Sequence, residues 1–112
     1  MTAAQFRAAA LSLTEATEGS HMGHADFRVR GKIFASLGPD EDWAMVKLPT
    51  GVQAALIDAD PTVYSPAKGA WGAQGATLIV LRGARVKVVK DALAAAWRHV
   101  APKGLAGPRV SD

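Results

Sequence analysis

The stretch that decides the fold is Asp26-Phe27-Arg28-Val29-Arg30-Gly31-Lys32-Ile33-Phe34-Ala35. Apolar and basic side chains alternate along both of its halves, which is typical of strands with one face in the core and one in solvent. The glycine between the halves supplies the positive φ that a tight hairpin turn requires. We therefore expect a β-hairpin with Arg28, Arg30 and Lys32 near its tip, their charges free for an outside anion.

Working outward from this hairpin, the sequence predicts a short series of helices and strands. Thr2 and Gln5 have the spacing of a capping box, which marks the start of a first helix, and Pro39 and Asp40 indicate a turn after the hairpin. The predicted helices are at about 3–13, 51–59 and 84–100, the strands at about 20–24, 26–30, 32–37, 43–48, 63–65 and 76–81, and a loop at about 66–75.

This order of elements, α-β-β-β-β-α-β-β-α, predicts an α+β domain with helices packed on one side of an antiparallel sheet. The 112 residues suffice for one domain, which we assign to residues 1–102, with a flexible C-terminal tail over 103–112. Burial of the apolar helix stripes against the sheet is expected to be the main stabilising contribution.

Composition limits the functional classes. Without cysteine the chain has no disulfide, no thiolate nucleophile and no zinc site built on sulfur. The apolar runs are shorter than the roughly 20 residues that cross a bilayer, and the first residues lack the features of a signal peptide. We therefore expect a cytoplasmic protein with no membrane partner.

The distribution of charge is more informative than the net charge of +3. Acidic residues prevail between positions 14 and 60, whereas basic residues prevail from Arg82 onward. Such an asymmetry can orient a domain on an anionic partner. The alternative is a solvated helix face that favours solubility.

Basic residues on or beside the predicted sheet, with one tryptophan able to stack on a base, are candidates for nucleic-acid binding. Because each neutralised phosphate contributes a slope of about −0.9 in log K against log salt, we expect weak, salt-sensitive binding to DNA without sequence readout. The alternative is that the lysines pair with the chain's own acids and that the tryptophan covers the core. The candidates are Arg28, Arg30, Lys32, Lys47, Lys68 and Trp71.

A binding pocket is the alternative to a DNA-binding surface. Phe34, Tyr64, Lys68 and Trp71 are predicted to line a cleft in which Lys68 meets the carboxylate or phosphate of a small ligand. This hypothesis predicts a concave site with a single cation, and it leaves a protein partner open as well. The oligomeric state and the physiological ligand do not follow from the sequence.

Neither a metal centre nor a catalytic group is predicted. His21 and His24 are three residues apart, and on one strand such residues point to opposite faces, so both reach one ion only if Gly23 bends the chain, and a site would also need a third ligand. Ser20 and His21 are neighbours that face apart, and no nucleophile motif or nucleotide-binding fingerprint occurs. We expect a protein that is not an enzyme and holds no cofactor.

Several segments resemble the MmcQ/YjbR family. They are the entry Thr14–Gly19 after the first helix, the hairpin Phe27–Ala35, the spacing from Lys68 to Trp71, and the C-terminal helix. The resemblance covers about Phe6 to Pro102, which is most of the chain.

The resemblance implies a fold and an activity. Family members are similar to the double wing of a phage transcription factor and to CyaY, a frataxin-like protein, which would imply DNA binding in the first case and metal binding in the second. Fold likeness alone does not transfer function. The chain departs from the family at Ala67 and Ala70, where many members carry asparagine and histidine, so a polar role of that pair is not carried over.

Overall fold

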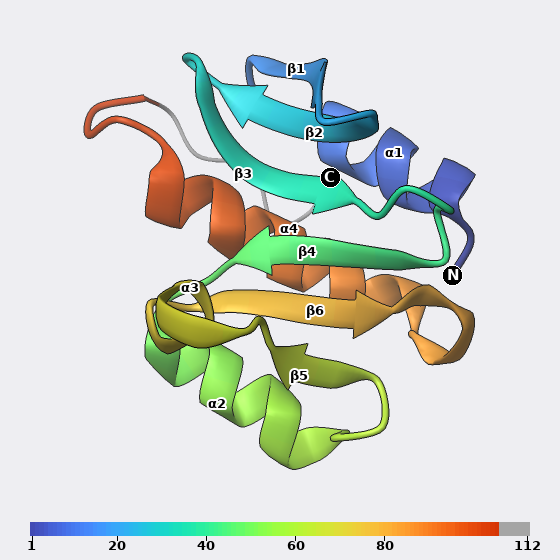
Figure 1. Cartoon of the computed structure of the whole chain (residues 1–112). Coiled ribbons are helices and arrows are strands. Elements are labelled where there is room, and N and C mark those ends of the chain that lie inside the picture. Colours follow the sequence, from blue (N-terminus) through green and yellow to red (C-terminus); the bar gives the residue numbers. More distant parts are fainter. Residues whose placement is uncertain (106–112) are drawn as a thin grey trace.

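The computed structural model describes residues 1–105 (Figure 1). Residues 106–112, most of the predicted tail, lie outside this part. Within it, no helix is long and apolar enough to span a membrane. The elements are α1 (Ala3–Leu11), β1 (Ala16–His21), β2 (His24–Val29), β3 (Lys32–Leu37), β4 (Trp43–Lys47), α2 (Thr50–Ala59), β5 (Tyr64–Pro66), α3 (Gly69–Ala73), β6 (Ala76–Val80), the 3-10 helix η1 (Leu81–Gly83) and α4 (Val86–Val100).

The strands form one six-stranded sheet with the order β1-β2-β3-β4-β6-β5, and every neighbouring pair is antiparallel. The predicted hairpin is β2–β3. Arg30 and Gly31 form its turn with φ of 50° and 80°, and Val29 pairs with Lys32. Positive φ at both central residues is the turn geometry that matches the twist of a two-residue hairpin. The predicted hairpin and its turn are therefore confirmed.

Helices α1 and α4 cover one face of the sheet (Figure 1), with α4 against β3 and β4. The core lies between these two helices and the sheet. There Phe6 of α1 meets Phe27 of β2 edge to face, with the ring centroids 5.9 Å apart. Truncation of such an aromatic to alanine costs about 3–5 kcal/mol. The largest fully buried side chains include Trp97, Phe6, Phe27, Phe34, Leu37, Leu48, Ile79 and Leu93. The predicted α+β class is therefore confirmed.

The first strand differs from the prediction. Instead of one strand at 20–24, the chain makes a second hairpin, β1–β2, whose turn is formed by Met22 and Gly23 with φ of 51° and 84°. The sequence pattern concealed this turn because a non-glycine residue such as methionine rarely adopts positive φ. As a consequence, His21 and His24 pair directly across the two strands.

The predicted loop at 66–75 contains a short helix, α3. The buried side chain of Gln53 on α2 stabilises it by donating hydrogen bonds to the carbonyls of Gly72 at 2.9 Å and Ala76 at 3.1 Å. Gly72 has no space for a side chain, since a Cβ there would collide with the carbonyl of Ala67. The glycines that indicated a loop therefore allow close packing.

Candidate functional site

One end of the sheet is hollowed into a pocket of about 560 Å³. Because neighbouring strands are antiparallel, the start of β3, the end of β4 and the start of β6 meet there, and Lys47 pairs with Ala76 across the last two. α3 and the C-terminal end of α4 complete the walls. The lining residues are Lys32, Ile33, Lys47, Trp71, Gln74, Ala76, His99 and Val100.

The pocket lining is cationic. Lys32 is exposed and Lys47 is half-buried, and neither forms an ion pair with any carboxylate among residues 1–105. His99 adds an imidazole from α4, and no acidic side chain among residues 1–105 lines the pocket. An anion entering it would meet two ammonium groups that have no partner in the described part of the chain.

Trp71 stands on a rigid support at the rim of the pocket. Trp71 is 70% exposed. Helix α3, which carries it, is held in place by the hydrogen bond from Gln53 and by the close contact at Gly72. The expectation that Trp71 could cover the core is therefore not met. An exposed aromatic ring on a fixed helix offers a flat apolar face to a ligand.

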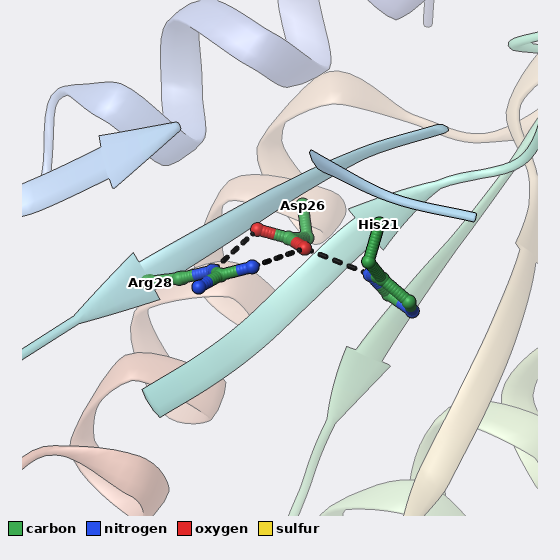
Figure 2. A network of polar contacts seen from close by, with 3 residues as sticks. All are labelled: His21, Asp26 and Arg28. Atoms are coloured by element: carbon green, nitrogen blue, oxygen red, sulfur yellow. Dashed lines mark hydrogen bonds and ion pairs between the residues drawn. The ribbon is translucent and has the colours of Figure 1, made fainter. Parts of the chain in front are cut away.

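The first arginine of the β2–β3 hairpin is neutralised within the chain (Figure 2). Arg28 Nε lies 2.7 Å from Asp26 Oδ1 and Nη2 lies 3.0 Å from Oδ2. The neighbouring residue on β1 is Gly19, where a Cβ would come within 3.0 Å of both Arg28 Nε and Asp26 Oδ1. The missing side chain at Gly19 therefore leaves room for the pair.

The carboxylate of Asp26 is fully buried and also accepts a hydrogen bond from His21 Nδ1 at 2.8 Å (Figure 2). The hydrogen bonds from Arg28, more than that from His21, hold the pKa of Asp26 below its usual value despite burial. Asp26 is therefore ionised at neutral pH and holds both partners in place.

The second arginine of this hairpin is also paired. Arg30 Nε and Nη2 lie 2.6 Å and 3.0 Å from the two carboxylate oxygens of Glu15, and the hydrogen bonding lowers the pKa of Glu15. Both side chains are exposed, so salt and competing anions can open this pair. The expectation that the hairpin charges are free is thus corrected for Arg28 and Arg30, because acids in β2 and before β1 reach them.

The structure divides the predicted site residues. Of the six nucleic-acid candidates, Lys32, Lys47 and Trp71 meet at the pocket. Lys68 lies just before α3 and is not among the lining residues. Nothing in this arrangement tests DNA binding, which stays a prediction.

The predicted four-residue pocket is not assembled. Phe34 is fully buried in the core, where it stands as an extra residue of β3, since Phe27 pairs with Ala35 and Arg28 with Ile33. Tyr64 is 4% exposed and lines a different pocket of about 260 Å³ near α2 and η1. Only Trp71 of this set reaches the larger pocket.

Sequence reasoning missed two residues that matter for the site. Gln53 lies in a helix that the sequence predicts from its apolar residues. Its single side-chain amide among them was the one sign of a buried polar role. His99 comes to the pocket only because α4 ends beside β3 and β4, a contact between segments far apart in the sequence.

Comparisons with known proteins agree with this fold. The family model for YjbR matches residues 11–99, whereas no curated protein matches the chain. The crystal structure of Deinococcus radiodurans protein DR2400, described with a DUF419 domain, superposes with a TM-score of 0.78 over 94% of this chain and 82% of that one, at 16% sequence identity. At such a low sequence identity, this structural likeness shows a shared fold and nothing more. Since the family model spans most of the sequence, including the hairpin and the segment from Lys68 to Trp71, the chain belongs to the YjbR family.

Proposed function

We propose that this YjbR domain is a non-enzymatic module that binds a small anionic ligand in the pocket at the end of the sheet. One observation carries the proposal: two lysines without an acidic partner among residues 1–105 and a rigidly held, exposed tryptophan line the same pocket of about 560 Å³. This volume lies within the range of roughly 300–1,000 Å³ that is common for small-molecule sites.

Different lining residues would contact different parts of the ligand. Lys32 and Lys47 would donate charge-assisted hydrogen bonds to a phosphate or carboxylate. Trp71 would contact a ring or apolar part of the ligand, with Ile33 and Ala76 on the pocket wall. The ligand class that suits both halves is a ring carrying a phosphate, of which a nucleoside monophosphate is the simplest probe.

Binding is favoured over catalysis by the chemistry of the lining. Within the described part of the chain, two lysines and one histidine are its titratable groups. Catalysis by paired carboxylates, or by a serine or cysteine nucleophile beside a base, needs residue types that residues 1–105 do not place in this lining.

Duplex DNA is the second candidate. The exposed Lys32 supports it, as does the double-wing likeness implied by the family. The ion pairs of Arg28 and Arg30 weigh against it, because a duplex would first have to displace Asp26 and Glu15. The two candidates differ in one respect: DNA bound by charge alone responds alike to the loss of any exposed cation.

The test is calorimetric titration with adenosine 5′-monophosphate at low salt. Wild type should bind saturably. The double variant Lys32→Ala/Lys47→Ala should bind at least about tenfold more weakly, since hydrogen bonds to charged groups contribute about 1.5–3 kcal/mol each. Trp71→Ala should weaken binding by roughly 5- to 150-fold, the equivalent of about 1–3 kcal/mol of stacking.

The matched control is Arg30→Ala/Arg82→Ala, which removes the same charge from exposed positions outside the pocket. It should bind the nucleotide like wild type. Equal weakening in both double variants, or the absence of saturable binding, would overturn the pocket proposal. Binding of duplex DNA that both double variants weaken alike would favour the second candidate.

A further inference from the structure

The β1–β2 hairpin brings two histidines together outside the pocket. His21 and His24 flank the two-residue turn of Met22 and Gly23 and pair directly across the strands. Residues that face each other in an antiparallel pair project from the same side of the sheet. Their ring centroids are 4.8 Å apart, so the two imidazoles can reach one ion.

The buried carboxylate of Asp26 sets the tautomer of His21. An ionised carboxylate can only accept hydrogen bonds, so His21 Nδ1 carries the proton in the 2.8 Å contact with Asp26 Oδ2 (Figure 2). In neutral His21 the lone pair is then on Nε2, the atom that does not face Asp26. A carboxylate behind one ring nitrogen is the arrangement that orients metal-binding histidines in many proteins.

His24 contributes an unsatisfied nitrogen. Its Nδ1 is buried and has no hydrogen-bond partner within residues 1–105. Buried polar atoms in folded proteins nearly always have a partner, and where the protein itself supplies none, a bound water or ion can take that place. An ion bound through His24 Nδ1 would remove the deficit.

We propose that His21 and His24 bind a divalent transition-metal ion that prefers imidazole, with Zn²⁺ as the representative. Asp26 and Arg28 form the outer layer that orients His21, and water fills the remaining coordination positions. No group of three or more His, Cys, Asp or Glu side chains in the described chain is arranged to hold a metal. The site therefore has two protein ligands and binds more weakly than a four-ligand structural zinc site. Mg²⁺ and Ca²⁺, which prefer oxygen ligands, do not compete.

Zinc titration of the full chain tests the proposal by calorimetry and by melting temperature. Wild type should bind one ion per chain and melt at a higher temperature in zinc, because a ligand of the native state stabilises it. His24→Ala should lose both effects. Ser65→Ala is the control, since it removes an exposed polar side chain on β5, away from the pocket and from the β1–β2 hairpin, and it should keep both effects.

Asp26→Asn separates orientation from ligation. Outer-layer substitutions weaken metal binding by about 10- to 100-fold, so this variant should still bind zinc, but within that weaker range. If it unfolds, the conservative variant Arg28→Lys, which breaks the two-point contact with Asp26, should also weaken zinc binding.

Three outcomes would overturn the proposal. The first is the absence of saturable zinc binding at millimolar zinc. The second is equal loss in the His24→Ala and Ser65→Ala variants. The third is a ratio of one ion to two chains, which would mean that the ion is shared between molecules.

Discussion

The β2–β3 hairpin and the end of the sheet are both rich in cations, but they differ in where the opposing charges are. In the hairpin, Asp26 precedes Arg28 by two residues on the same strand face, and Glu15 reaches Arg30 from just before β1. At the end of the sheet, Lys32 and Lys47 meet no carboxylate of the described chain. A basic pattern in a sequence therefore becomes a free cationic surface only where the fold keeps acids away from it.

The two regions also differ in how they are supported. In the β2–β3 hairpin, the ion pair of Asp26 and Arg28 fits because Gly19 has no side chain. The pocket instead depends on neutral packing around α3, through Gln53, Gly72 and Gly75. Because the supports are separate, single substitutions can affect one region at a time.

The largest effect is expected at Gly75, the residue directly before β6. It has φ of +110°, and a Cβ would collide with the carbonyl of Leu48. Gly75→Ala should lower the free energy of unfolding by about 2–5 kcal/mol through backbone strain and overpacking, measured by denaturant unfolding. Gly51→Ala, where a Cβ meets open space on α2, should leave stability unchanged or raise it by up to about 1 kcal/mol. A tolerated Gly75→Ala would mean that α3 is not held as described.

Removal of the amide that holds α3 should have the next largest effect. Gln53→Ala deletes two buried hydrogen bonds and should lower the free energy of unfolding by about 1–3 kcal/mol. Gln74→Ala, at an exposed position, should change it by less than about 0.5 kcal/mol. Equal effects in the two variants would contradict the support assigned to Gln53.

The ion pair of Asp26 and Arg28 in the β2–β3 hairpin should make the melting temperature depend on pH. Because the pKa of Asp26 is lowered in the folded protein, its stabilising contribution is complete above its unfolded value of about 4 and is lost as pH falls through the folded value. Wild type should lose melting temperature on acidification below about pH 4 more steeply than Asp26→Asn. Parallel pH profiles would show that this carboxylate is not specially stabilised.

The smallest effect is expected at the exposed pair of the hairpin. Glu15→Gln releases Arg30 without opening the core, and exposed pairs contribute little to stability, so the melting temperature should not change. The variant should instead gain weak, salt-sensitive affinity for heparin, measured by column elution. A large loss of stability would mean that this pair contributes more than its exposure allows.

Local chemistry explains what could be predicted from the sequence. The capping box at the start of α1 forms as expected, with the Thr2 hydroxyl accepting from the Gln5 amide at 3.1 Å and Gln5 Oε1 accepting from the Thr2 amide at 2.9 Å. The turn at Arg30 and Gly31 was equally accessible, because alternation and glycine act within a few residues. The pair of Asp26 and Arg28 could have been inferred from their spacing of two along one strand.

Contacts between distant segments explain what was missed. α3 depends on Gln53, which is 19 residues from Gly72, and the pocket depends on β4 lying beside β6 and on the position where α4 ends. The turn at Met22 required positive φ in a residue that seldom adopts it. Lys32, Lys47 and Trp71 were identified as candidates by residue type, but their grouping follows from the sheet order.

Binding in the pocket is tested most directly by the amide and indole NMR spectrum of the protein during titration with adenosine 5′-monophosphate. We expect the shifts to concentrate at Ile33, Lys47, the Trp71 indole and Val100, which belong to the pocket lining, whereas the signals of residues 26–30 do not shift. Shifts that concentrate instead on the hairpin residues 26–30, with the pocket signals unmoved, would contradict binding in the pocket.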